Sequence, residues 1–342
     1  METEEMACAL MSWYDGHKRV LPWRQTRDAY AVWISEIILQ QTRVAQGYDY
    51  YLRFMKEFPT VEALAAADED RVLRMWQGLG YYSRARNLHA ASKQVAAMGG
   101  FPRSYDGLRA LKGVGDYTAA AIGSFSFDLP VAVVDGNVYR VLSRLFGIDE
   151  PIDTARGKKL FAELAAQLLP PAHSAHYNQA IMEFGALQCV PRGADCGACP
   201  LAGCCAALAE GRVDELPVKK HRTKVTERYF HYCYVHDAEH LYLRKRTGDD
   251  IWRGLYELPL AEREVADEAE SVAEWGLMLP EVTFGRRGGR KHVLSHQVIH
   301  ATLYEAEVPS PLPPCEDYII IRKDELDNYA LPRLILLLME SL

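Results

Sequence analysis

The chain has 342 residues, 49% of them hydrophobic and 25% charged, with a formal net charge of −7 at pH 7, which is typical of a soluble globular protein with two domains. It has no apolar run long enough to span a membrane and its N-terminal METEEMACAL is no secretory signal, so we expect a cytoplasmic protein with reduced thiols. The negative net charge alone argues against nucleic acid as a partner, although clustered basic groups can outweigh it.

Residues 28–44, DAYAVWISEIILQQTRV, have the broad apolar face of a helix, and Asp28 is a plausible cap at its start. Glu36 lies inside this face beside Trp33 and Ile37. Removal from water disfavours the charged carboxylate and raises its pKa, as a general acid near neutral pH requires. The alternative is a glutamate at the edge of the face that reaches water, which is the commoner situation for a single glutamate.

A second helix is expected over TVEALAAADEDRVLRMWQ, residues 60–77, with Thr60 as its cap. The next segment, GLGYYSRARNLHAAS at 78–92, begins with a glycine-rich turn that carries Tyr81 close to Arg84. Aromatic residues on such a turn beside arginines suit insertion into a base stack and contact with phosphate. The alternative is a helix start whose tyrosine packs inward.

Residues 104–144 are predicted to form a helix, a tight hairpin, a second helix and a segment that carries an acid. Ser104 can cap the first helix, KGVG at 112–115 forms the hairpin, and the second helix begins near Asp116. Backbone amides at such a helix start bind phosphate without reading sequence. Asp135 follows in the motif VVDGN. The alternative is a hairpin that only packs two helices, with Asp135 as the cap of the next helix.

Two further helices are expected, DTARGKKLFAELAAQLL at 153–169, capped by Asp153, and HSAHYNQAIMEFGALQC at 173–189. Helical patterns therefore dominate as far as Gln188. The first part of the chain is predicted to be all-α.

Five of the eight cysteines fall within residues 189–205, and four of them have the spacing C-x6-C-x2-C-x5-C. Four thiolates in one short loop can enclose a metal ion or an iron–sulfur cluster. Structural zinc usually uses two close pairs, and this loop has one CxxC, while a reducing compartment disfavours disulfides. Cys204 is an extra thiol that could compete with its neighbour Cys205.

The pattern changes after a basic segment, PVKKHRTKVTER at 217–228. YFHYCYVH, HLYLRKR and ATLYEAEV alternate and are rich in aromatic and β-branched residues, which is typical of strands. The second part of the chain is therefore predicted to contain a sheet.

Several of these segments together resemble one enzyme family. They are LPWR at 21–24 with SEIILQQTRV at 35–44, the turn at 78–89, the hairpin and following acid at 111–140, and the cysteine loop at 189–205. They are similar to the MutY-type adenine DNA glycosylases of the helix-hairpin-helix superfamily, whose cysteine loop, shared with endonuclease III, holds a 4Fe–4S cluster. GDDIWRGLYELPL at 248–260 more loosely resembles the MutT-like (Nudix-like) domain that ends these enzymes.

The resemblance implies the architecture. Residues 1–216 would form an all-α helix-hairpin-helix glycosylase domain that includes the iron–sulfur loop. Residues 217–228 would be a basic linker, and residues 229–342 an α+β MutT-like lesion-recognition domain.

The resemblance also implies the activity: a monomeric DNA repair enzyme that hydrolyses the N-glycosidic bond of adenine opposite 8-oxoguanine or guanine in double-stranded DNA, after flipping the adenine out. Glu36 would protonate the base and ionised Asp135 would stabilise an oxocarbenium-like sugar. Asn137 would hold the backbone near Asp135, and Tyr117 would lie near the sugar. Lyase members of the superfamily carry a lysine at the position of Tyr117, so monofunctional hydrolysis is expected.

The remaining site residues carry over from the same resemblance. The adenine pocket would be lined by Trp23, Arg24, Leu39 and Gln179. The DNA would be contacted by Gln40, Gln41, Thr42, Leu79, Tyr81, Arg84, Lys112, Gly113, Val114 and Gly115, with Tyr81 as the wedge in the base stack. The oxidised guanine would be inspected by Ser295 and His296 of VLSHQVIH. A structural 4Fe–4S cluster would be bound by Cys189, Cys196, Cys199 and Cys205.

One departure from the related hydrolases matters. AEREVADEAESVAEWG, residues 261–276, has acids but not the REx2EE spacing of nucleotide-hydrolysing MutT-like domains, so no hydrolase activity is expected from this half. Three alternatives remain open: an endonuclease III-like lyase acting on oxidised pyrimidines, a non-catalytic iron–sulfur protein that binds DNA or senses redox state, and a nucleotide pyrophosphohydrolase.

Overall fold

The computed structural model describes residues 2–221, 224–263, 275, 279 and 282–342. The chain divides into two compact units, the first formed by Met1–Ala65 and Ala90–Arg222 and the second by Ala66–His89 and Thr223–Leu342. The second unit is therefore discontinuous in sequence, because a segment of the helical half of the chain belongs to it.

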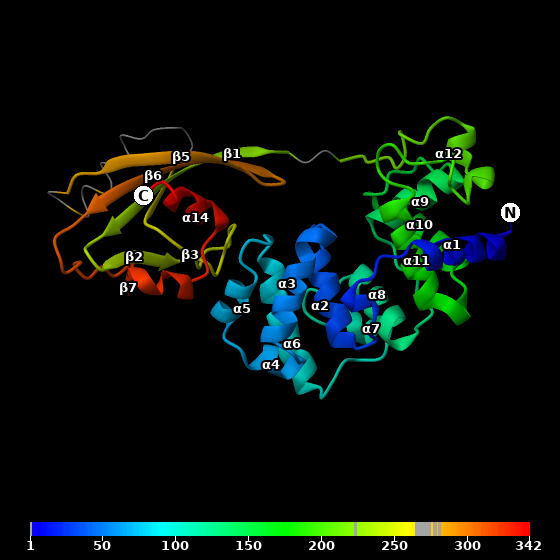
Figure 1. Ribbon diagram of the computed structural model, residues 1–342, viewed down its shortest axis with the longest axis horizontal. Coiled ribbons are helices and arrows are strands. Elements are labelled where there is room, and N and C mark those ends of the chain that lie inside the picture. The colour runs from blue at the N-terminus through cyan, green and yellow to red at the C-terminus, as the bar shows by residue number, and fades with distance from the viewer. Residues whose placement is uncertain (1, 222–223, 264–274, 276–278, 280–281) are drawn as a thin grey trace. The chain divides into compact units, whose positions relative to one another are not determined.

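The first unit is built from helices (Figure 1). They are α1 (Thr3–His17), η1 (Pro22–Arg24), α2 (Ala29–Leu39), α3 (Val44–Glu57), α4 (Val61–Ala66), the end of α6 (Ser83–Ala97), α7 (Tyr105–Arg109), α8 (Asp116–Phe127), α9 (Gly136–Phe146), α10 (Ala155–Leu168), η2 (Pro171–His173), α11 (Ser174–Leu187), η3 (Ala202–Cys204) and α12 (Ala206–Ala209). The predicted all-α character of this part of the chain is confirmed.

A hydrophobic core joins α1, α9, α10 and α11, with Leu10, Leu142, Phe161 and Phe184 almost completely buried at its centre. Helix α2 is buried along residues 29–38 and packs against α3 and α8. A polar side chain on α2 is therefore enclosed by neighbouring helices.

Three helix predictions differ from the structure. Helix α2 ends at Leu39 instead of continuing to Val44, because Gln41 has a left-handed backbone with φ 56°. Residues 60–77 form two helices, α4 and α5 (Glu69–Met75), separated by the extended backbone of Asp68. The cap of α10 is Thr154, because Asp153 instead accepts hydrogen bonds from the backbone of residues 220–221.

The predicted caps at Asp28 and Ser104 are confirmed, since each side chain accepts a backbone hydrogen bond from the first turn of its helix. Thr60 likewise accepts from the amide of Ala63 at 3.2 Å. These three positions follow local sequence rules and involve no distant part of the chain.

The second unit carries a mixed sheet together with α5 and the start of α6 (Figure 1). Its described strands are β1 (Thr226–His236), β2 (His240–Lys245), β3 (Tyr256–Glu257), β4 (Leu260–Arg263), β5 (Gly285–Val293), β6 (Gln297–Glu307) and β7 (Ile319–Arg322). The order is β3-β2-β1-β6-β5, and β4 pairs with β1 and β7 with β2. The predicted α+β character of the C-terminal part is confirmed.

Strands β1 and β6 run parallel along their whole length, while β5 and β6 form an antiparallel hairpin. Helix α14 (Arg333–Met339) packs against both strands of this hairpin, where Leu334, Ile335 and Leu338 join the core. The hairpin turn is closed by the amide of Leu294, which donates 2.8 Å to the carbonyl of Gln297. This turn presents Ser295 and His296 at its tip.

Among the described residues, no helix combines the length and apolar character that a membrane span needs. The acidic segment 261–276 lies almost entirely outside the described residues, as do residues 222–223 of the basic segment.

Candidate active site

Glu36 lies on α2 with 7% of its surface exposed, and its carboxylate accepts a 2.5 Å hydrogen bond from the hydroxyl of Tyr117 in the first turn of α8. Burial raises the pKa of Glu36 to about 7. The negative charge of Asp135 acts in the same direction, while the hydrogen bond from Tyr117 and the charge of Arg24 oppose the shift. A carboxyl group with this pKa keeps its proton in a large fraction of molecules at neutral pH, as a general acid must.

Asp135 is the N-cap of α9, and its carboxylate accepts hydrogen bonds of 2.8 Å from the amide of Val138 and 2.8 Å from the side chain of Asn137. Burial raises the pKa of Asp135, and these hydrogen bonds together with the charge of Arg140 oppose the rise. Capping and a place at the site are therefore not alternatives, because one carboxylate does both.

A cavity of about 560 Å³ in the first unit brings the two carboxylates together with every predicted member of the adenine pocket. Its predicted lining residues are Trp23, Arg24, Leu39, Tyr117, Asn137 and Gln179. A partly protonated acid and a second carboxylate that accepts two hydrogen bonds share one cavity. That combination supplies both the proton and the anion that cleavage of a glycosidic bond uses.

Glu183 and Arg19 also line this cavity and escaped the sequence analysis. The side chain of Glu183 is completely buried, and it accepts hydrogen bonds from the amide of Arg19 at 3.0 Å, from its guanidinium at 2.8 and 2.5 Å, and from Arg24 at 2.7 Å. Burial works against its charge, but these hydrogen bonds outweigh burial and lower the pKa of Glu183 to about 2. The available signal is its position one turn after Gln179, on the same face of α11.

Gln179 itself accepts a 2.7 Å hydrogen bond from the hydroxyl of Tyr14 on α1. The ring of Tyr14 also lies under the guanidinium of Arg24, 5.9 Å from its carbon. The polar wall of the cavity is thus a connected set of side chains from α1, η1 and α11.

The three predicted DNA-facing residues after α2 have different surroundings. Gln40 donates 3.2 Å to the hydroxyl of Thr118, Gln41 is exposed with its left-handed backbone, and Thr42 lines the cavity. Gln41 is thus the most exposed of the three.

The hairpin at 112–115 has the form that phosphate binding needs. Gly113 has φ 73°, which favours glycine, and Lys112, Gly113 and Gly115 are exposed while Val114 is buried as an anchor. The hairpin leads directly into α8, whose second residue is Tyr117. A phosphate bound at this turn would therefore lie at the start of the helix that carries Tyr117.

The cysteine loop follows α11, and its five cysteines are free and partly buried. Cys189 accepts a 3.4 Å hydrogen bond from the guanidinium of Arg144, and the thiol of Cys205 donates 3.4 Å to the carbonyl of Arg144. Burial, together with the charges of the other three predicted ligands, raises the pKa of Cys199 to about 11, and a hydrogen bond with the backbone of Leu201 opposes the rise. Four thiolates gathered in one loop repel one another unless a positive centre lies among them.

In the described part of the chain no three Cys, His, Asp or Glu side chains lie as close as the ligands of one metal ion. The loop supplies four thiols with a single CxxC pair, a donor set that suits an iron–sulfur cluster.

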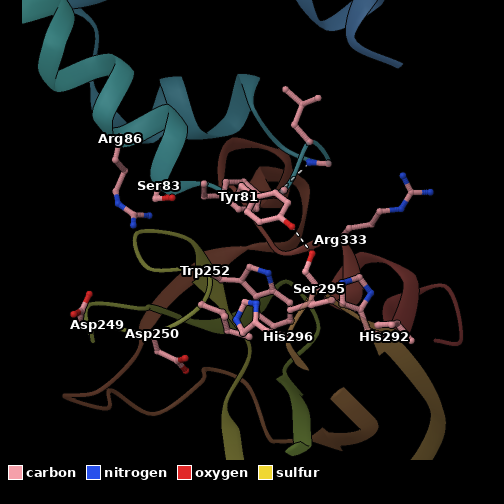
Figure 2. Close-up of a pocket in the computed structure, with 17 residues that line it drawn as sticks. Tyr81, Ser83, Arg86, Asp249, Asp250, Trp252, His292, Ser295, His296 and Arg333 are labelled. Atoms are coloured by element: carbon pink, nitrogen blue, oxygen red, sulfur yellow. Dashed lines mark hydrogen bonds between the residues drawn. The ribbon is translucent and has the colours of Figure 1, made fainter. Parts of the chain in front are cut away.

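A second cavity, of about 590 Å³, lies within the second unit (Figure 2). It gathers four residues predicted to contact DNA or the lesion, namely Leu79, Tyr81, Ser295 and His296. The hydroxyl groups of Tyr81 and Ser295 are hydrogen-bonded to each other, although 214 residues separate them. The turn before α6 and the tip of the β5–β6 hairpin thus meet in one site.

Arg84 is 9% exposed and braces the turn that carries Tyr81. Its guanidinium donates 3.1 Å to the carbonyl of Gly80 and 3.4 Å to that of Leu79, and it lies over the rings of Trp76 and Tyr81. Burial lowers the pKa of Arg84 to about 10. In this structure the residue holds the turn in place, and phosphate contact by Arg84 stays a prediction.

Comparison with family models matches residues 34–168 to the HhH-GPD superfamily of base excision DNA repair proteins and residues 231–341 to the NUDIX domain. The first match contains Glu36, the hairpin and Asp135. The second contains Ser295 and His296.

Curated relatives carry one name. The chain is 35% identical to the adenine DNA glycosylase of Rattus norvegicus over 89% of its own length and 70% of the relative's. It is 31% identical to the adenine DNA glycosylase of Buchnera aphidicola subsp. Baizongia pistaciae over 86% and 83% of the two lengths. Among solved structures, a thermostable thymine-DNA glycosylase is similar with a TM-score of 0.57 and 27% identity, over 61% of this chain and 97% of the other.

Proposed function

Because the chain belongs to the adenine DNA glycosylases of the HhH-GPD superfamily, we propose that it removes adenine from double-stranded DNA in which the opposite base is 8-oxoguanine or guanine. The observation that carries this proposal is the pair Glu36 and Asp135 in one cavity, with burial raising the pKa of Glu36 to about 7. The pair supplies the acid and the anion that the reaction requires.

The reaction begins when the adenine is flipped out of the duplex into the cavity of the first unit. Glu36 donates its proton to a ring nitrogen of adenine, which makes the base a better leaving group. The bond between the base and C1′ of the sugar then breaks, and both bonding electrons leave with the base. Water adds to C1′ and gives a proton to the carboxylate of Glu36, which restores the acid and leaves an abasic site and free adenine.

Asp135 stabilises the positive charge that develops on the sugar. Its hydrogen bonds from Val138 and Asn137 favour the ionised form against the cost of burial. Tyr117 donates its hydroxyl hydrogen to Glu36 and so orients the acid. Each carboxyl group therefore has a fixed hydrogen-bonding partner. Glu36 can be protonated while Asp135 is ionised.

A 4Fe–4S cluster would be held by Cys189, Cys196, Cys199 and Cys205, and it would supply a rigid, positively charged centre for the loop. Arg144 links this loop to α9 through hydrogen bonds of 2.8 and 3.1 Å to the carbonyls of Val190 and Pro191. Purified protein should be yellow-brown with about four irons per chain. Stoichiometric zinc without visible absorbance would contradict the cluster.

The cavity of the second unit is proposed to inspect the base opposite the adenine. Ser295 and His296 supply hydrogen-bonding groups at the hairpin tip, and Tyr81 enters the base stack from the turn before α6. Discrimination between 8-oxoguanine and guanine would come from the polar atoms by which the two bases differ.

The test is a panel of substrates given to the pure native protein. Duplexes with adenine opposite 8-oxoguanine should lose adenine fastest, followed by adenine opposite guanine, whereas thymine glycol duplexes and oxidised dGTP should remain intact. The Glu36→Gln variant, which cannot donate the proton, should bind the duplex and release no adenine. Cleavage of thymine glycol or of oxidised dGTP in place of adenine release would overturn the proposal.

Monofunctional hydrolysis has its own test at Tyr117. A lyase attacks C1′ with an amine and forms a Schiff base, which tyrosine cannot do. Borohydride should therefore trap no covalent complex with the native protein, and strands should break only after alkali. The Tyr117→Lys variant places an amine near the sugar, where burial lowers its pKa, and trapping should appear. Efficient trapping by the native protein would exclude the monofunctional assignment.

A further inference from the structure

Trp252 has a backbone that its side chain disfavours. It lies in the loop between β2 and β3 with φ 60°, and bulky residues rarely adopt this left-handed region. Among the described residues, four that are not glycine have positive φ, namely Gln41, Tyr81, Asp128 and Trp252. Two of the four, both aromatic, line the same cavity in the second unit.

The loop is held in this strained form by its surroundings. Arg246 donates 3.1 Å to the carbonyl of Ile251 and 2.8 Å to the carboxylate of Asp250, and its own carbonyl accepts 2.7 Å from the amide of Gly254. Arg228 holds Asp250 through a further ion pair at 2.6 Å. Backbone strain that the surroundings enforce in this way is found at functional sites.

The position of the Trp252 ring also indicates a functional role. Trp252 lies 6.0 Å from the ring of His292 and 6.1 Å from that of Phe230, measured between centroids. Figure 2 shows its indole on the same cavity as Tyr81, with Ser295 and His296 beside it. The cavity thus has aromatic side chains from both the α6 turn and the β2–β3 loop, and hydrogen-bonding groups next to them.

We propose that Trp252 is a base-stacking residue for the base opposite the adenine, and that it selects a purine at this position through the area of its aromatic face. The inference rests on the proposed function, because it assigns a further contact to the same base. Stacking does not read polar atoms, so Trp252 favours 8-oxoguanine and guanine alike over a pyrimidine. The choice between the two purines is left to the hairpin tip.

Equilibrium binding to duplexes tests this assignment. The adenosine is replaced by a tetrahydrofuran abasic analogue, so that no excision occurs, and the opposite position carries 8-oxoguanine, guanine, cytosine or a second tetrahydrofuran. Native protein is compared with Trp252→Asn, which tolerates the left-handed backbone and has no aromatic face, and with Trp252→Phe, which keeps one.

Trp252→Asn should bind the two purine duplexes about tenfold more weakly than the native protein does, by an equal factor for 8-oxoguanine and guanine. Its affinity for the duplex with no opposite base should change less than about twofold, and Trp252→Phe should recover most of the loss. Equal weakening for all four duplexes would show that Trp252 only supports the fold and would overturn the proposal, as would no weakening.

A second measurement compares the full-length native protein with Trp252→Phe, so it does not depend on the folding of Trp252→Asn. 2-Aminopurine at the position opposite the abasic analogue should be strongly quenched by native protein and less by Trp252→Phe, because the smaller ring covers less of the base. Identical quenching by both proteins would contradict stacking on Trp252. Failure of the native protein to release adenine opposite 8-oxoguanine would instead contradict the proposed function. Quenching and adenine release are measured in separate experiments, so the two results can be distinguished.

Discussion

Glu36 makes the folded chain less stable than a neutral residue in its place would. Its pKa is about 7 in the folded state against 4.5 in water. Between these values the folded state binds more protons than the unfolded state, so stability falls as pH rises through this window. The cost is complete above pH 7 and absent below pH 4.5.

Glu36→Gln should therefore raise the free energy of unfolding by up to about 3 kcal/mol at pH 8 and leave it unchanged at pH 4. Urea denaturation at the two pH values measures the difference. Glu163→Gln serves as the control, because Glu163 is an exposed glutamate on α10 whose removal should shift stability by less than about 0.5 kcal/mol. Equal destabilisation by Glu36→Gln at both pH values would exclude a buried, partly protonated Glu36.

The rate of excision should depend on pH through both carboxylates. Above about pH 7 Glu36 loses its proton, and the rate should fall. On the acid side Asp135 gains a proton, and because burial raises the pKa of Asp135 this limb should lie above the range of an ordinary aspartate. The two groups interact, so each limb belongs to the pair. Single-turnover rates from pH 4 to 9 give the profile, and a flat profile would contradict the assignment of acid and anion.

The hairpin between α7 and α8 is the element whose backbone we expect to bind the DNA phosphates. Its turn has Gly113 at φ 73° and exposed, while Val114 anchors the turn in the core. Contacts of this kind fix the register of a duplex without reading its bases.

Gly113→Ala should lower the free energy of unfolding by about 1 kcal/mol, because alanine disfavours the left-handed backbone. Gly115→Ala is the matched control, since its φ is −92° and an added methyl group meets no atom within 4 Å, so its stability should not change. Each variant should weaken binding, and the factor should be the same for damaged and undamaged duplexes. Fluorescence anisotropy measures these affinities. A selective loss for the damaged duplex would show that the hairpin reads the lesion.

Local rules accounted for much of the helical part. Asp28, Thr60 and Ser104 cap their helices because a cap needs only the next three residues. Asp153 is not the predicted cap, because its carboxylate accepts hydrogen bonds from the amides of residues 220–221, which no local pattern reveals. The same limit applies to Glu183, whose partner Arg19 lies 164 residues away.

The candidate site likewise contains some residues that local motifs predict and some contacts that only distant packing creates. Glu36, Asp135 and the hairpin stand within short motifs that the sequence shows directly. The hydrogen bond of Tyr81 to Ser295 and the left-handed backbone of Trp252 arise from the packing of segments far apart in the chain. Periodicity and composition carry no information on such contacts.

At the scale of the whole molecule, the second unit includes residues 66–89 from the helical half. Asp70 accepts hydrogen bonds from Lys245 and, at 2.9 Å, from the hydroxyl of Tyr256. Arg74 donates 3.2 Å to Asn328. Helix α5 is thus tied to the sheet by polar contacts on one side.

A chain that ends at residue 222 should therefore lose protection of its backbone amides in residues 69–86, while amides in α2, α8 and α9 keep theirs. Hydrogen–deuterium exchange with mass spectrometry of the shortened and full chains measures this difference. Asp70→Asn in the full chain should give a smaller loss over α5 alone, since an exposed ion pair contributes about 1 kcal/mol or less. Unchanged exchange in residues 69–86 of the shortened chain would contradict the grouping.

Because the second unit is formed by two separate segments, it limits which chimeras between relatives can fold. A chimera that exchanges only residues 223–342 would join a foreign sheet to the native α5 and to the native turn with Tyr81, and mismatches would arise at Asp70, Arg74 and Tyr81. The module that transfers intact is a pair of segments, 66–89 and 223–342, grafted together. We therefore expect a substitution at these contacts in one segment to need a compensating substitution in the other, although 133 residues of the first unit lie between them.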